Sequence, residues 1–424
     1  MQCGRYRRFW FSAAVVAALL LSVPNFVARA GAPKAADHWV GTWSASPEAA
    51  AGSIGSSESF ANQTVRMIVH TSIGGHRVRV RLSNAYNTTP VVIGAVHIAL
   101  RSREAAIQPG SDHPLTFSGL QSVTIPPGAL VLSDPVDLEV PELSDLSVSV
   151  YVPGSAGPAT WHTTGHHPTY ISGTGNFTSS ADMPYATMKP SWYWLADVEV
   201  LAPADAQAIV AFGDSITDGA ATKPDTNSDW PSVLAKRLLS QSGHHSEIAV
   251  LNEGISGNRV LHDFIGQNAL ARFDADVLAQ PGVRSVILLL GINDIGFNTL
   301  KLPGRDTVSE AVTADEIIAG QRQIIERAHE HGLRIFGGTL TPFEGARYYS
   351  AEGEAKRQAV NAWIRTGGAF DGVIDFDAAV RDPGHPTQVS AADDSGDHLH
   401  PSAAGYKAMG EAVDLSLFSG AASR

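Results

Sequence analysis

Residues 208–219, AIVAFGDSITDG, join a continuous apolar run to a polar turn that carries a serine. An apolar run of this length is typical of a strand buried on both faces of a parallel sheet. Residues that directly follow such a strand open into the crevice where α/β folds bind their ligands. The stretch therefore predicts an α/β domain with Ser215 at the carboxyl edge of its sheet.

The rest of the carboxyl-terminal half repeats this alternation of apolar strands and helices. Further strands are predicted at 248–251, 285–290, 334–338 and 372–375, and helices at 230–239, 314–331 and 354–364. Buried strands separated by helices indicate a parallel sheet inside a three-layer α/β/α domain.

The region before residue 203 has a different pattern. Short runs of alternating or apolar residues lie between Gly, Pro, Asn and Ser, at 65–69, 78–82, 91–96, 122–125 and 146–152. This pattern predicts an all-β sandwich of the jelly-roll type. A chain of 424 residues exceeds the roughly 250–300 at which one core stops growing, so we expect two domains. From the change of pattern we predict a signal peptide at 1–30, a β-sandwich accessory domain at 31–203 and the α/β domain at 204–424.

The first thirty residues have the features of an export signal. Arginines precede an apolar stretch, Phe9–Val23, and Ala28-Arg29-Ala30 supplies a small-x-small cleavage pattern. We predict cleavage after Ala30 and a secreted or periplasmic protein. A membrane anchor is the alternative, but the run is shorter than the ~20 residues that a spanning helix needs, so we expect no membrane span in the mature chain. Because Arg7-Arg8 faintly resembles a twin-arginine signal, the general secretory and twin-arginine routes both stay open.

Charge and cysteine content exclude several classes of function. The formal net charge is −12, and removal of four arginines with the signal peptide gives −12 − 4 = −16. Such a chain lacks the clustered Lys and Arg that phosphate binding needs, so nucleic acid is not an expected partner. The one cysteine, Cys3, lies in the predicted signal peptide, which leaves no disulfide or thiol nucleophile in the mature chain.

Four polar segments that follow predicted strands resemble the four sequence blocks of the SGNH (GDSL) hydrolase family. They are GDSIT (213–217), NEGISGN (252–258), GIND (291–294) and DHLHP (397–401). The residues that mark the family fall at Ser215, Gly257, Asn293 and His400, and the resemblance covers roughly residues 205–415. It implies an SGNH-type fold and a serine esterase that acts on small-molecule or polysaccharide esters.

The residue types explain the chemistry that such blocks would perform. A serine hydroxyl is a weak nucleophile until a base takes its proton, and His400 is the natural base for Ser215. Asp397, three residues earlier, can accept the other imidazole N–H. The family resemblance implies an oxyanion hole made by the backbone N–H groups of Ser215 and Gly257 and by the Asn293 amide.

Each of these residues also has a purely structural interpretation. Ser215 and Asn293 can cap helices, and Gly257 can be a turn glycine. His398 is a rival base beside an aspartate, although the spacing to Asp397 and the following Pro401 favour His400.

Neighbouring residues and histidine pairs complete the set of candidates. Asp214, Asn258 and Asp294 stand beside the block residues and are candidates for the substrate pocket. No H-E-x-x-H motif occurs among the sixteen histidines, so we expect no metal and no cofactor. We interpret His166-His167 and His244-His245 as solvated loop residues.

Three features of the sequence together resemble a subgroup of the family and so indicate a class of substrate. A β-domain, the ISGNR sequence at 255–259 and a helix that begins at Trp230-Pro231 are together similar to exported bacterial carbohydrate esterases, including acetylxylan esterases. This similarity implies deacetylation of carbohydrate or hydrolysis of short-chain acyl esters. The alternatives are a lysophospholipase or lipase-type acylhydrolase, and a carbohydrate-binding protein with an inactive hydrolase domain. We expect Trp192-Tyr193-Trp194 to fill a core rather than to stack on sugar rings.

Overall fold

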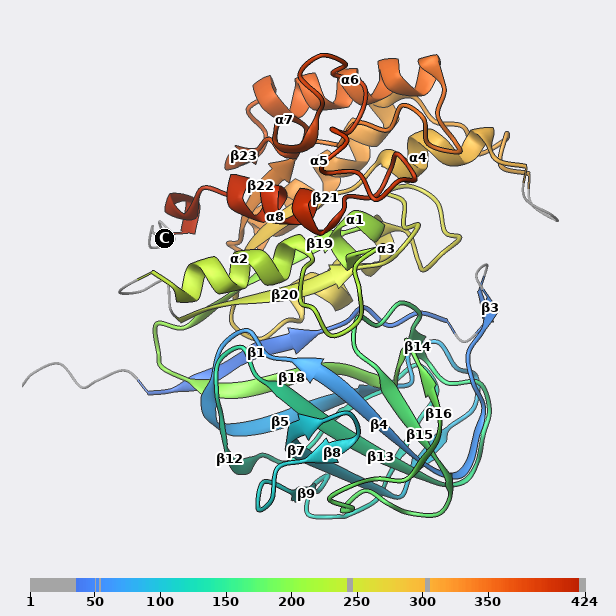
Figure 1. The fold of residues 1–424 in the computed structure, drawn as a ribbon, viewed down its shortest axis with the longest axis vertical. Helices are drawn as coiled ribbons and strands as arrows, with labels where there is room; N and C mark the ends of the chain where they lie inside the picture. Colours follow the sequence, from blue (N-terminus) through green and yellow to red (C-terminus); the bar gives the residue numbers. More distant parts are fainter. Residues whose placement is uncertain (1–35, 50, 53–54, 242–246, 302–305, 419–424) are drawn as a thin grey trace, which may run out of the picture. The chain divides into compact units, whose positions relative to one another are not determined.

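A computed structural model describes residues 36–49, 51–52, 55–241, 247–301 and 306–418 (Figure 1). The predicted signal peptide, residues 1–30, and the His244-His245 pair lie outside these ranges. In the described part of the chain, no helix is both long enough and apolar enough to cross a membrane.

The amino-terminal region consists of antiparallel strands in two main sheets. The first has the order β1-β18-β5-β11 with β12 beside β5, and the second has the order β16-β15-β4-β13-β7-β8 with β9 beside β7. The strands of this region are β1 (His38–Ser44), β2 (Ala51–Gly52), β3 (Gly55–Ser56), β4 (Phe60–His70), β5 (Gly75–Ser83), β6 (Val91–Ile93), β7 (Ala95–Arg103), β8 (Ala106–Ile107), β9 (His113–Leu115), β10 (Val123–Ile125), β11 (Leu130–Leu132), β12 (Val136–Val140), β13 (Asp145–Ala156), β14 (Trp161–His162), β15 (Thr169–Thr174), β16 (Tyr185–Lys189), β17 (Trp192–Tyr193) and β18 (Leu195–Ala202).

Gly94 divides the run at 91–96, which the sequence pattern presents as one strand, into β6 and β7. Its backbone N–H donates to the Tyr151 carbonyl at 2.8 Å. A Cβ at this position would lie 2.9 Å from the Tyr151 ring, so only glycine allows this close approach of the two backbones.

The carboxyl-terminal half contains a five-stranded parallel sheet with the order β20-β19-β21-β22-β23. Its strands are β19 (Gln207–Gly213), β20 (Ile248–Gly254), β21 (Val283–Leu289), β22 (Arg334–Gly338) and β23 (Gly372–Ile374). The helices are α1 (Ser215–Asp218), α2 (Trp230–Leu239), α3 (Ala269–Phe273), η2 (Asp274–Leu278), α4 (Ile292–Gly296), η3 (Phe297–Thr299), α5 (Ala314–Glu330), α6 (Ala351–Thr366), α7 (Phe376–Val380), α8 (Ala403–Ala412) and η4 (Leu415–Phe418). The predicted fold class, a parallel α/β domain after an antiparallel β-rich region, is confirmed.

The β-rich region and the α/β domain pack directly against each other, with β1 beside β20 (Figure 1). The Gly41 N–H donates to the Pro281 carbonyl at 3.0 Å, and the Val250 N–H donates to Ser72 Oγ at 3.2 Å. Buried apolar residues of both regions form one continuous cluster. The predicted boundary at 203–204 falls between β18 and β19, and as a division into two domains it stays a prediction.

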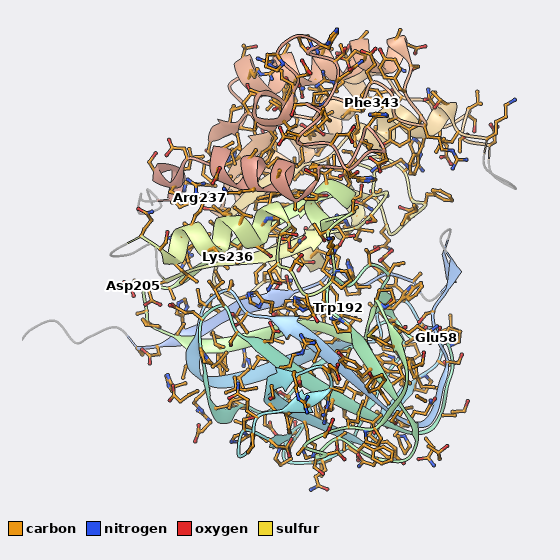
Figure 2. The ribbon with its side chains drawn as sticks, in the orientation of Figure 1. Glu58, Trp192, Asp205, Lys236, Arg237 and Phe343 are labelled. Carbon is orange, nitrogen blue, oxygen red and sulfur yellow. The ribbon has the colours of Figure 1, made fainter. Side chains whose placement is uncertain are left out.

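The tryptophans before this boundary fill the interior, as we predicted from the sequence. Trp192, Tyr193 and Trp194 are all buried, and Figure 2 shows Trp192 at the junction of the two regions. Its ring packs edge-on against Trp43 at 4.9 Å. The Arg79 guanidinium covers the partly exposed ring of Trp39 at 4.1 Å.

Candidate active site

The order of the parallel strands defines where the site lies. β19 has β20 on one side and β21 on the other, so the chain leaves β19 in one direction and later returns to its opposite side. Ligand sites of open α/β sheets lie at the carboxyl ends of strands where the order switches in this way. Ser215, Gly257 and Asn293 follow β19, β20 and β21, so the topology brings three of the four family blocks to one edge of the sheet.

The nucleophile block forms a single helical turn, α1. Asp214 caps this turn because its Oδ1 accepts the Ile216 N–H at 3.0 Å, and Gly219 ends the turn with a φ of +105°. Ser215, the first residue of the turn, is 6% exposed. Burial raises the pKa of Asp214 to about 7.

A hydrogen-bonded chain joins the serine to the last block. His400 Nε2 lies 2.9 Å from Ser215 Oγ, and His400 Nδ1 lies 2.6 Å from Asp397 Oδ2. Burial acts to raise the pKa of Asp397, but hydrogen bonds from the His400 ring and from the backbone of His400 and Leu399 outweigh it and hold the pKa below its usual value. The ionised carboxylate accepts the Nδ1 proton, so Nε2 can accept a proton from the serine.

The rival histidine lies away from the serine. His398 Nδ1 lies 2.6 Å from Asp394 Oδ2, and its side chain is 55% exposed. Its backbone has a φ of +63°, an uncommon value for a residue with a Cβ. On either side of it, the Asp397 carboxylate accepts the His400 backbone N–H at 2.8 Å and lies 2.6 Å from the His400 ring. The structure therefore brings His400, not His398, to Ser215.

Gly257 and Asn293 occupy positions that their residue types require. A Cβ on Gly257, whose φ is +82°, would lie 2.3 Å from Ile265 Cδ1. The Asn293 Oδ1 accepts from the Tyr348 hydroxyl at 3.2 Å, and its Nδ2 donates to the Asn258 carbonyl at 3.0 Å. These bonds fix which end of the amide is nitrogen. An amide has two N–H donors, and the bond to Asn258 uses only one of them.

The three candidate pocket residues are buried and have internal partners. Asp214 caps α1. Asp294 accepts the N–H groups of Val260 and Leu261 at 2.7 and 3.1 Å, so it holds the loop after β20. Asn258 donates to the carbonyls of Ile265 and Gln267. In this placement Asp214 holds the turn after β19, and Asn258 and Asp294 hold the loop after β20.

Arg272, which was not predicted from the sequence, binds the carboxyl ends of β19 and β20 beside the site. Its guanidinium is almost completely buried and packs over the Phe212 ring at 4.1 Å. Its hydrogen bonds reach the acceptors Asn258 Oδ1, Ser46 Oγ, the Glu253 carbonyl, Asp276 Oδ2 and the Gly213 carbonyl at 2.8–3.0 Å. Apart from the i,i+4 pair with Asp276, its partners come from other segments of the chain, so spacing in the sequence does not indicate this role.

A second buried cluster joins the β-rich region to the nucleophile turn. Asp218 Oδ1 lies 3.2 Å from His162 Nε2 and 3.3 Å from His166 Nε2. The His162 Nδ1 lies 2.9 Å from the Ser46 carbonyl. A neutral imidazole has one N–H and both acceptors need one, so His162 must carry a proton on each nitrogen. Although burial opposes the charge, Asp218 and then Glu48 raise the pKa of His162 to about 9.

This raised pKa predicts a stability contribution that depends on pH. A group whose pKa is higher when folded stabilises the fold fully below its ordinary value near 6.5, and the contribution is lost as pH rises through 9. We expect His162 to contribute about 3 kcal/mol at pH 6 and little at pH 10. Urea unfolding of wild type and His162→Gln at both pH values measures it. A difference between the two proteins that is equal at both pH values contradicts the prediction.

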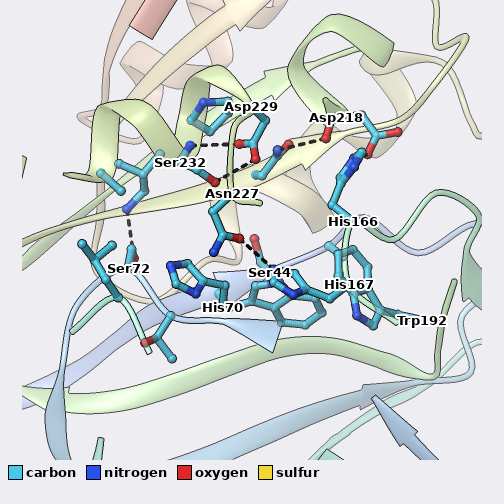
Figure 3. A pocket seen from close by; sticks show the side chains of 18 of the residues that line it. Ser44, His70, Ser72, His166, His167, Trp192, Asp218, Asn227, Asp229 and Ser232 are labelled. Atoms are coloured by element: carbon cyan, nitrogen blue, oxygen red, sulfur yellow. Dashed lines mark hydrogen bonds and ion pairs between the residues drawn. The ribbon is translucent and has the colours of Figure 1, made fainter. Parts of the chain in front are cut away.

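The interpretation of His166-His167 as solvated loop residues is wrong. Figure 3 shows both beside a pocket whose lining includes His70, Asn227 and Asp229. The two ring nitrogens of His167 lie 2.7 Å from Asp225 Oδ1 and 2.8 Å from Asn227 Oδ1. His167 is buried and His166 is half-buried, and carboxylate, amide and hydroxyl groups from other segments satisfy their rings. The sequence pattern does not reveal these contacts, because they join distant segments.

One group of side chains in the described ranges has the spacing of metal ligands. The ligand-type atoms of His70, Asp145 and His167 lie within 4.8 Å of one another. His70 Nδ1 is 2.7 Å from Asp145 Oδ1, and Arg101 donates to the other oxygen of Asp145 at 3.1 Å. An arginine on the same carboxylate offsets the charge that would attract a cation, so we interpret the group as an ion-pair cluster. The expectation that no metal is required stays a prediction.

Comparison with known proteins bears on the same part of the chain. Residues 211–408 match the GDSL-like Lipase/Acylhydrolase family. These residues form a GDSL-like lipase/acylhydrolase domain. As a GDSL-like acylhydrolase, the protein is a carboxylic ester hydrolase, and its substrate is an ester. A search of curated proteins found no match.

Among solved structures, this GDSL-like hydrolase is similar to a G-D-S-L family lipolytic protein from Desulfitobacterium hafniense. The two share 25% identity over 49% of this chain and 97% of the other, with a TM-score of 0.36. Axe2, an acetylxylan esterase from Geobacillus stearothermophilus, shares 24% identity over 49% and 91%, with a TM-score of 0.37. A GDSL-like lipase from Bacteroides thetaiotaomicron shares 17% identity over 50% and 88%, also with a TM-score of 0.37.

Proposed function

We propose that the protein hydrolyses short-chain carboxylic esters through an acyl-serine intermediate on Ser215. The observation that carries the proposal is the continuous chain from Asp397 through His400 to Ser215, with steps of 2.6 and 2.9 Å. Both distances are within hydrogen-bond reach, which the transfer of a proton from nucleophile to base requires.

The geometry supports a two-step reaction in which Ser215 is the nucleophile and His400 is the base. Ser215 Oγ attacks the carbonyl carbon and passes its proton to His400 Nε2, while Asp397 stabilises the imidazolium. The carbonyl oxygen becomes an oxyanion, for which the backbone N–H groups of Ser215 and Gly257 and the Asn293 amide are the proposed donors. His400 returns the proton to the alcohol as the C–O bond breaks. Water then attacks the acyl-serine, with the same base, and releases the acid.

The proposed substrates are acetylated carbohydrates or other short-chain acyl esters. Two observations favour them: the resemblance of the ISGNR block to carbohydrate esterases, and the 6% exposure of Ser215, which suits a small acyl group. A screen of nitrophenyl esters from acetyl to palmitoyl, with acetylated xylan beside them, tests the choice. Rates that rise with acyl length would instead identify a lipase-type acylhydrolase.

Removal of one oxyanion donor gives a separate test of the site. We expect Asn293→Ala to lower kcat by about 10²–10³, because the amide stabilises charge that develops only in the transition state. Initial rates with nitrophenyl acetate measure this loss. Asn298→Ala, a change in the following short helix η3, serves as the control and should keep kcat within about twofold. If both variants keep wild-type kcat, Asn293 is not an oxyanion donor.

A further inference from the structure

The loop after β20 presents Gly257 in a tight turn. The Asn258 N–H donates to the Ile255 carbonyl at 3.0 Å and closes the turn, and Gly257 has the positive φ that the third position of a type II turn requires. Type I and type II turns differ by rotation of the central peptide, here the Ser256–Gly257 peptide. That rotation would reverse the direction of the Gly257 N–H. Catalysis through this N–H therefore needs an interaction that fixes the orientation of the Ser256–Gly257 peptide.

Ser256, the residue before Gly257, is anchored to the nucleophile turn. Its Oγ donates to Asp218 Oδ2 at 2.5 Å. Asp218 is the last residue of α1, three positions after Ser215, and is 2% exposed. The two segments touch along their backbones as well, since a Cβ on Gly254 would lie 2.2 Å from the Asp218 nitrogen. The turn and the nucleophile are thus tied together by one carboxylate.

The charge of this carboxylate depends on the β-rich region. His162 from β14 and His166 from the following loop approach the other carboxylate oxygen of Asp218 (Figure 3 shows His166 and Asp218). A buried carboxylate without a cationic partner costs several kcal/mol, and it would be protonated or would draw in water. With protonated His162 beside it, Asp218 stays an ion and a strong acceptor for Ser256.

We propose that Asp218 and Ser256 are positioning residues for the oxyanion hole, and that the β-rich region completes the hole by holding Asp218 through His162 and His166. The inference rests on the role of Gly257 in the proposed function. It gives the amino-terminal region a part in catalysis, in addition to any contact with substrate.

Ser256→Ala tests the inference with little change in volume. We expect kcat for nitrophenyl acetate to fall about 10- to 100-fold, less than the loss of a whole donor, while KM stays within about twofold. Inhibition by a boronic acid, whose serine adduct places an oxygen in the hole, should weaken by the same factor. Ser256→Thr, which keeps the hydroxyl, should restore both.

Ser232→Ala is the matched control, because Ser232 also donates to a carboxylate, Asp229, at 2.8 Å, in the pocket that Asp218 lines. It should leave kcat and boronate affinity unchanged. A Ser256→Ala enzyme with wild-type kcat and boronate affinity overturns the inference. An inactive wild type, equal to Ser215→Ala, would instead contradict the proposed function.

A second variant, His162→Gln, tests the inference if Ser256→Ala folds poorly. His162→Gln acts on the same carboxylate from the β-rich region and should lower kcat without a matching change in KM. If His162 and Ser256 act through Asp218, Ser256→Ala should add little to the loss in the His162→Gln enzyme. Retention of wild-type kcat by folded His162→Gln also overturns the inference.

Discussion

Ser215→Ala is expected to lower kcat by at least about 10⁴-fold toward any ester that the wild type hydrolyses. Without Oγ no acyl-serine can form, and the remaining rate comes only from binding and the oxyanion donors. The fold should hardly change, because Ser215 begins a turn that Asp214 caps and Gly219 ends. The measurement is steady-state turnover of nitrophenyl acetate, with thermal unfolding to confirm the fold.

The control for this experiment is Ser240→Ala, an exposed serine at the end of α2. It should keep full turnover. Labelling by a fluorophosphonate gives an independent measure: wild type and Ser240→Ala should react at one site, and Ser215→Ala should not. A wild type that neither labels nor turns over any ester would favour the alternative of a carbohydrate-binding protein with an inactive hydrolase domain.

Arg272→Met is expected to lower the free energy of unfolding by about 3–5 kcal/mol, a large part of the stability of an ordinary domain. Methionine keeps much of the length and the contact with Phe212. It leaves the buried Asp276 carboxylate without its cation and removes donors from the Gly213 and Glu253 carbonyls. The large cost comes from these unsatisfied buried groups rather than from the lost attraction alone.

Urea unfolding followed by tryptophan fluorescence measures this loss. Arg284→Met replaces an exposed arginine at the start of β21 and should change stability by no more than about 0.5 kcal/mol. A similar small change for Arg272→Met would show that the guanidinium does not hold these segments together.

Much of the fold followed from local pattern. The helix predicted at 230–239 has those bounds in the structure, and the one predicted at 314–331 ends at Glu330. The predicted parallel strands lie within about three residues of the observed ones. Such elements are readable because apolar period and capping residues act over a few positions. The break at Gly94 was not predicted, since it depends on a contact with Tyr151 from a distant strand.

By itself, the sequence determined the candidate residues of the site and the positions along the chain of the strands that precede them. Ser215, Gly257, Asn293 and His400 each follow a predicted strand or precede a turn within their own segment. Those features are local, because a residue's neighbours along the chain set its backbone conformation.

Only the tertiary structure decided which groups support that site. It brought His400 rather than His398 to Ser215, buried His167 and half-buried His166, and placed Arg272 and His162 against the segments that carry Ser215 and Gly257. Those choices depend on hydrogen bonds between segments up to 226 residues apart. A buried charge is stable only where the fold assembles its partners, so no local pattern could have identified them.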